Sequence, residues 1–169
     1  MNPEPFSLGN RPAEIRTHID FFVRSDDLCL DAISVQLGIQ PTYGFEARAR
    51  YLVRKNAGDE LPTVERRRPA FGIWHYSTNG RIEHDALEDH ASFILKILEP
   101  SAQEILQLRN EGKYTIAMIC WHVGPSGFQL SSSVLTRLAR LTEWISFTCW
   151  ETEEEFADEN GVMVPRRAE

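Results

Sequence analysis

Short segments in which apolar and polar residues alternate recur along the chain and predict β-strands with one better-buried face. Such alternation is found at residues 17–23, 46–54, 70–77 and 144–150. Residues 114–123 are almost wholly apolar, which is typical of a central strand covered on both sides. A further short strand is expected at 128–130, after the Gly-Pro-Ser-Gly turn at 124–127.

Four helices are predicted from apolar residues at three- and four-residue spacing, each preceded by a residue that commonly caps a helix. The predicted N-terminal residues are Asp31, Asp85, Ser101 and Ser131. Glu88 and Glu104 stand three residues after two of them, which is the spacing of a capping box. The expected ends of the first three helices are Gly38, Pro100 and Gly112.

The order of these segments predicts an α+β fold: an antiparallel or mixed sheet with helices packed mainly on one face, of the ferredoxin-like kind. Residues 30–45 and 130–147 both run from a short helix into a strand, which is compatible with a pseudo-duplicated domain. We expect one domain at 15–150, a flexible N-terminus at 1–14 and an acidic tail at 151–169. Within the domain, residues 44–69 are expected to form a basic strand and loop.

Several short motifs recur in a characteristic order between residues 15 and 150. They are the strand 19–23, the segment Leu-Gly-Ile-Gln-Pro-Thr at 37–42, Gly-Ile-Trp at 72–74, the helix 87–100 followed by Ile105 and Leu108, the segment 127–141 and the strand around Phe147. In these features the chain resembles the bacterial family named domain of unknown function 4279. The resemblance implies a small α/β fold without an established activity, and it carries over no catalytic residue.

Composition and charge narrow the classes of function. The chain has 169 residues, 42% of them hydrophobic, with 18 basic and 25 acidic side chains and a net charge of −7. This acidic balance argues against nucleic-acid binding, because phosphate contacts need a basic face. The sequence has no apolar run long enough to span a membrane and no signal peptide, so we expect a cytoplasmic protein without membrane contact. Cys29, Cys120 and Cys149 are expected to be reduced and buried.

The sequence contains no phosphate-binding loop, dinucleotide fingerprint or nucleophile elbow. We therefore expect no cofactor, no bound metal, no catalytic residue and no enzyme activity. One pair of the kind used in general-base catalysis does occur, because His18 and Asp20 share a face of the first strand. Its simpler interpretation is a hydrogen-bonded surface or edge pair.

Two histidines each follow a tryptophan near the ends of strands that could be neighbours. A small-molecule or metal-binding pocket, possible in an enzyme as well, would then be lined by Trp74, His75, Trp121 and His122. Cys120 could join such a site as a soft metal ligand, but the sequence nominates no fourth ligand. The simpler interpretation is two histidines at strand ends.

Aromatic and basic residues suggest two binding surfaces. Strand periodicity places Trp144 and Trp150 on one face, and we expect Trp74 on the same side, as a partner surface or homodimer seam unless other segments cover it. A second surface is a basic patch for an anion or acidic partner, or else simply a solvated strand and loop. Its candidate residues are Arg48, Arg50, Arg54, Arg66, Arg67 and Arg68.

These observations favour a non-enzymatic protein-interaction module that binds a protein partner or a second copy of itself. One specific form of the hypothesis is an immunity-type inhibitor of a bacterial toxin, because an acidic body attracts cationic effectors. The alternative is the small-molecule or metal-binding domain with the pocket described above.

Overall fold

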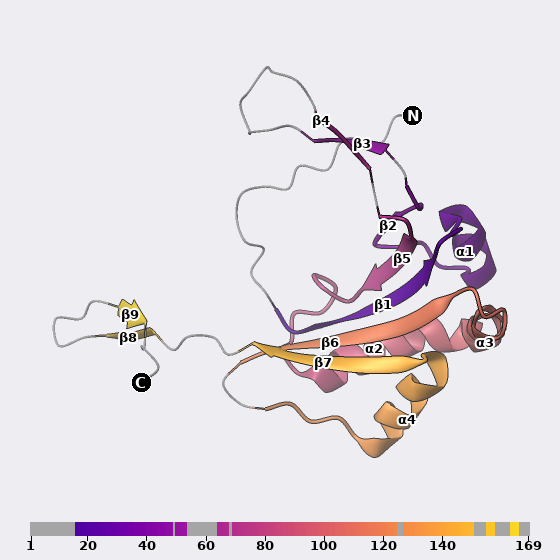
Figure 1. The fold of residues 1–169 in the computed structure, drawn as a ribbon. Coiled ribbons are helices and arrows are strands. Elements are labelled where there is room, and N and C mark those ends of the chain that lie inside the picture. Colours follow the sequence, from indigo (N-terminus) through magenta and orange to yellow (C-terminus); the bar gives the residue numbers. More distant parts are fainter. Residues whose placement is uncertain are drawn as a thin grey trace.

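The fold is built around one five-stranded sheet (Figure 1). The computed structural model describes residues 16–48, 50–53, 64–67, 69–124, 127–150, 155–157 and 163–165. Its strands are β1 (His18–Ser25), β2 (Tyr43–Phe45), β3 (Arg50–Val53), β4 (Val64–Arg67), β5 (Gly72–Ser77), β6 (Thr115–Val123), β7 (Trp144–Trp150), β8 (Glu155–Ala157) and β9 (Met163–Pro165). Its helices are α1 (Leu30–Leu37), α2 (Leu87–Leu98), the 3₁₀ turn η1 (Glu99–Ser101), α3 (Ala102–Asn110) and α4 (Ser132–Leu141).

The main sheet has the strand order β2-β5-β1-β6-β7. β1 is antiparallel to both β5 and β6, and β2 is antiparallel to β5, whereas β7 is parallel to β6. The predicted α+β fold with a mixed sheet is therefore confirmed. The ferredoxin-like connectivity and the duplication are not: β6 and β7, which α4 connects, are direct neighbours, whereas in a split β-α-β motif another strand lies between them.

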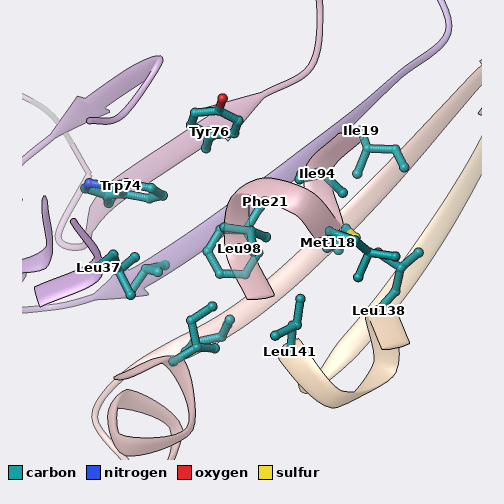
Figure 2. Packing of buried hydrophobic residues seen from close by; sticks show 14 of the residues in the cluster. Ile19, Phe21, Leu37, Trp74, Tyr76, Ile94, Leu98, Met118, Leu138 and Leu141 are labelled. Carbon is teal, nitrogen blue, oxygen red and sulfur yellow. The ribbon is translucent and has the colours of Figure 1, made fainter. Parts of the chain in front are cut away.

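The hydrophobic core lies between one face of this sheet and the helices. Alternate residues of β1, β5 and β6 point into it, among them Phe21, Trp74 and Met118, which are fully buried (Figure 2). The helices contribute Ile94 and Leu98 from α2 and other apolar residues from α1, α3 and α4. Ile33, Leu37, Ile105, Leu108, Val134, Leu138 and Leu141 are all buried there. The helical spacing seen in the sequence thus marks the side of each helix that faces the sheet.

Helix ends agree with the sequence better than helix starts do. Gly38 and Gly112 have positive φ angles of 66° and 70° at the ends of α1 and α3, and Ser131 caps α4 by accepting a hydrogen bond from the Val134 amide at 3.3 Å. Ser101 occupies the N-cap position of α3, although its side chain makes no capping hydrogen bond. The two predicted aspartate caps are wrong. Asp31 lies inside α1, and Asp85 precedes the start of α2.

Two of the residues that were expected to form capping boxes instead make hydrogen bonds between helices. The Glu88 carboxylate accepts hydrogen bonds from the backbone amide and hydroxyl of Ser131, at 3.0 and 2.9 Å, and so ties α2 to the start of α4. The Ser101 hydroxyl donates to the Leu37 carbonyl at 2.6 Å and joins the α2–α3 connection to α1. These residues therefore fasten helices to one another.

Several strand predictions need correction. Residues 46–54 do not form one strand: Arg48 has a φ of 55°, which ends the β2 segment before β3 begins. The loop expected up to Pro69 contains β4, which pairs with β3 in a separate two-stranded sheet. No strand forms at 128–130, and a β8–β9 hairpin lies within the expected acidic tail. The predicted flexible N-terminus, residues 1–14, falls outside the described residues.

A search of the described helices finds none with the length and apolar character needed to cross a membrane.

Candidate functional site

The face of the main sheet opposite the helices carries the candidate site, and we call it the open face. Residues that alternate with the core residues point towards it, and most of them are half-buried rather than fully buried. On this face the strand register pairs Phe22 with His75, His18 with Trp121, and Tyr43 with His75. The register thus brings aromatic rings from β1, β2, β5 and β6 together.

Asp20 lies at the centre of the open face and its carboxylate is hydrogen-bonded on both oxygens. His75 Nε2 lies 2.9 Å from Oδ1, and Trp121 Nε1 donates to Oδ2 at 2.8 Å. His18 Nε2 lies 3.3 Å from the same Oδ2 atom, and the Ser77 hydroxyl also hydrogen-bonds to the carboxylate. Only 10% of the Asp20 side chain is exposed, so several donors from three strands replace its water.

The geometry around Asp20 determines its charge. Burial alone would raise the pKa of Asp20, but the hydrogen bonds from His18, His75 and Ser77 hold the pKa of this carboxyl well below its usual range. The carboxylate is therefore ionised throughout the neutral range. A buried carboxylate with this many donors is a structural anchor for the face and a poor proton acceptor for catalysis at neutral pH.

His18 is held between two acceptors. Its Nε2 faces the ionised Asp20, and its Nδ1 lies 2.6 Å from the Arg16 carbonyl oxygen. Neither oxygen can donate, so both contacts are satisfied only when His18 carries two protons. Burial lowers the pKa of His18, but the hydrogen bond and charge of Asp20 and the bond to the Arg16 carbonyl outweigh burial and raise that pKa overall.

This arrangement predicts a pH dependence of stability. The folded-state pKa of His18 is raised above its unfolded value, so its contribution is complete below about pH 6.5 and is lost as the pH rises through the folded value. We expect the difference in unfolding free energy between wild type and His18→Gln to shrink as the pH rises from 6 to about 9. Urea titrations across this range measure it, and a pH-independent difference would contradict the protonated His18.

Stacked rings surround the carboxylate. His18 stacks on Trp121 with ring centroids 5.6 Å apart, and Phe22 stacks on His75 at 4.6 Å. Tyr43 meets the His75 ring edge-on at 6.4 Å. Further along, the Arg24 guanidinium lies 3.7 Å above the centre of the Phe71 ring. The open face therefore carries a cluster of aromatic rings around a carboxylate whose hydrogen bonds are already made.

The four residues expected to line one pocket are divided between the two faces of the sheet. His75 and Trp121 lie on the open face, where both contact Asp20. Trp74 is fully buried on the helix side, where its indole N–H donates to the Ser34 hydroxyl at 3.0 Å. His122 is also on the helix side, with its ring 5.7 Å from that of Phe128. The pocket expected from the sequence is thus not assembled from these residues.

Two further features concern ligands. A depression of about 570 Å³ lies at the end of β1, and its lining is Arg24, Ser25, Asp26, Asp27, Lys113 and Thr115. In the part of the chain that the structure describes, no group of three or more His, Cys, Asp or Glu side chains is placed to hold a metal ion.

Cys120 is buried as expected, and burial raises the pKa of its thiol to about 12, but Cys29 and Cys149 are exposed, contrary to the prediction.

The predicted tryptophan surface is corrected in part. Trp144 pairs with Ala117 on the open face and is 49% exposed. Trp74 lies on the opposite face, because the register from β5 through β1 and β6 to β7 puts it in line with core residues. Trp150 pairs with Val123 at the end of β7, and its side chain lies outside what the structure describes.

The basic patch is only partly within the described residues. Arg48 is exposed, and β3 and β4 place Arg50 opposite Arg67 and Arg66 opposite Tyr51. Arg54 and Arg68 lie outside the described residues. The role of this patch in binding an anion or acidic partner stays a prediction.

Sequence reasoning identified the His18–Asp20 pair but missed its other partners. His75 and Trp121 are 55 and 101 residues from Asp20 along the chain. The one local signal was Trp121 itself, a residue with a polar N–H within a mostly apolar strand. Phe22 and Tyr43 were also missed as parts of the same surface.

The fold and the open face define a class: an α+β domain with helices on one side of a mixed sheet and an aromatic surface around a buried carboxylate on the other. The chain belongs to the family described as Domain of unknown function (DUF4279), which matches residues 14–151. Comparisons with curated proteins and with solved structures gave no match.

Proposed function

We propose that this domain is a non-enzymatic interaction module that docks a partner protein on its open face. The observation that supports this most directly is the contrast between the two faces of the sheet. On the helix side Phe21, Trp74 and Met118 are fully buried and the exposed ring is that of Phe147 on the edge strand β7, whereas the opposite side keeps half-buried rings and a Trp144 that is 49% exposed. Exposed aromatic surface of this kind is enriched where proteins bind one another.

The polar centre of the open face fits the same function. Asp20 has its donors in place, so a partner that covers it need not supply a compensating charge. A charge that is paired before association adds little further desolvation cost on binding. The stacked rings around it are also held in position, which lowers the entropy lost when a partner docks.

An immunity-type inhibitor of a bacterial toxin is the specific form of this proposal that we carry forward. Its support is the net charge of −7, which would attract a cationic effector over a distance and speed association. A cytoplasmic setting belongs to the proposal, since the three cysteines are free thiols and the cytosol keeps thiols reduced.

The alternative function, a small-molecule or metal site near Trp74, His75, Trp121 and His122, receives less support. Two of these residues face the helices and two face away from them, so one ligand could not contact all four. We therefore give preference to the protein-docking function.

The test compares two variants that add the same charge to opposite sides of the domain. Tyr43→Glu places a carboxylate on the open face, and Val35→Glu places one on α1, where Val35 is 83% exposed. We expect a stoichiometric partner to co-purify at native abundance with wild type and with Val35→Glu, and to be reduced at least about tenfold with Tyr43→Glu.

Circular dichroism should confirm that both variants are folded. A wild-type protein that purifies without a partner, or a partner retained by Tyr43→Glu, would contradict docking on the open face.

A further inference from the structure

The outer edge of β7 is a second surface, distinct from the open face. β7 is the last strand in the sheet order, so among the described residues no strand pairs with its outer side. Its seven residues include no charge, no proline and no glycine. Proteins usually protect a long edge strand with such features, because its unpaired backbone groups can bind another strand.

The sequence of β7, Trp-Ile-Ser-Phe-Thr-Cys-Trp, is close to a palindrome centred on Phe147. If two copies of the strand pair antiparallel about that residue, Trp144 stands opposite Trp150, Ile145 opposite Cys149 and Ser146 opposite Thr148. Phe147 stands opposite itself. Each position thus meets a residue of similar size and polarity, as a two-fold symmetric interface requires.

Exposure and charge along the edge support the same pairing. Trp144 and Phe147 are 49% and 40% exposed, although both are large apolar residues. The ring of Phe147 is stacked on that of Phe128 at 5.1 Å, so it is already held in place beside the edge. A second copy would pack against the Phe147 ring beside the two-fold axis, and no like charges would meet across that axis within the strand.

We propose that β7 pairs antiparallel with β7 of a second copy of this chain, with the two-fold axis at Phe147. The two five-stranded sheets then become one continuous ten-stranded sheet. Because paired residues lie on the same side of a sheet, the two open faces join into a single larger surface. The occupant of this edge is therefore the protein itself, whatever partner the open face binds.

The central residue gives a sharp test, because any side chain at position 147 meets its own copy. Phe147→Lys and Phe147→Glu should each be monomeric, since like charges face one another, and an equimolar mixture should form a heterodimer. Light scattering after size-exclusion chromatography measures the masses, with wild type expected at twice 19.4 kDa. A monomeric wild type, or charge variants that remain dimeric, would overturn the proposal.

A cross-linking experiment tests the register independently of those variants. Opposite residues in antiparallel strands have Cα atoms about 4.5–5.5 Å apart, within the range that a disulfide spans. In a Cys29→Ser background, Ile145→Cys should therefore link to Cys149 of the second copy on mild oxidation. The control that also carries Cys149→Ala should give no such dimer on a non-reducing gel, and the absence of the link in the Ile145→Cys protein would rule out this register.

The two proposals fail separately. Tyr43 lies on β2, at the opposite edge of the sheet from β7. Tyr43→Glu should therefore leave the mass of the dimer unchanged while it weakens docking on the open face. If Tyr43→Glu dissociated the dimer, the edge assignment would be wrong, whereas loss of the partner alone would leave it intact.

Discussion

Trp74→Ala should destabilise the folded protein by about 3–5 kcal/mol, the usual cost of removing a fully buried aromatic side chain. The indole of Trp74 is 0% exposed, packs edge-on against Phe21 at 6.2 Å and donates a hydrogen bond to Ser34. Alanine would leave a cavity between the sheet and the helices, and the Ser34 hydroxyl would lose that donor. For a chain of this size, the expected fall in Tm is about 10 °C.

The matched control is Trp144→Ala, which should change the stability of the monomer by less than about 1 kcal/mol because the side chain is half exposed in a single copy. Chemical denaturation of both variants under one set of conditions gives the two free energies. The sequence predicted that Trp74 and Trp144 lie on the same face of the sheet. If the two alanine variants lost the same unfolding free energy, that prediction would be favoured over the structure. Trp74→Phe should fall between wild type and alanine, since it keeps most of the volume but not the hydrogen bond.

Asp20→Ala is the second large effect, with an expected loss of about 3–5 kcal/mol. The reason differs from that for Trp74. Removing the carboxylate leaves the Trp121 N–H without its acceptor and the imidazolium of His18 without its counter-charge, both at partly buried positions. Asp20→Asn should cost less, because the amide oxygen still accepts one of these hydrogen bonds.

Acid titration separates this contribution from simple packing. The folded-state pKa of Asp20 is lowered, so its stabilising effect is present above about pH 4 and is lost as the pH falls towards the folded value. Wild type should therefore lose stability below pH 4 more steeply than Asp20→Asn does. The matched control is Asp26→Asn, which removes an exposed carboxylate from the turn that follows β1. If Asp20→Asn and wild type gave parallel curves, the network around Asp20 would not have the charge inferred for it.

Much of the local structure could be predicted from the sequence because it depends on short-range patterns. Alternation marked 70–77 and 144–150 as strands, and the spacing of Val134, Leu138 and Leu141 marked the buried side of α4. The glycines that end α1 and α3 were found because few other residues adopt a positive φ. The predicted cap at Asp85 was wrong, because α2 begins one residue later with Ala86 at the N-cap position. Glu88, the expected partner in the capping box, accepts hydrogen bonds from Ser131, which is distant in the sequence.

The candidate site could be predicted only within single strands. Alternation correctly places His18 and Asp20 on one face, since residues two apart in a strand point the same way. Alternation cannot show whether residues of different strands, such as Trp74 and Trp144, lie on the same face of the sheet. A shift of one residue in the pairing of two neighbouring strands moves every side chain of one strand to the opposite face. The same holds for His75 and His122. The three-tryptophan surface depended on that unknown register, whereas the pocket conflicted with alternation itself, because adjacent residues such as Trp74 and His75 point to opposite faces of a strand.

By itself the sequence determined the family, the α+β class and the buried stripe of each helix, because these follow from local spacing and from motifs in order along the chain. The tertiary structure alone decided which sheet face the helices cover and which donors surround Asp20. Apart from His18, which lies two residues from Asp20 on β1, those donors come from β5 and β6, and only the pairing of strands far apart in the sequence brings them within hydrogen-bonding distance.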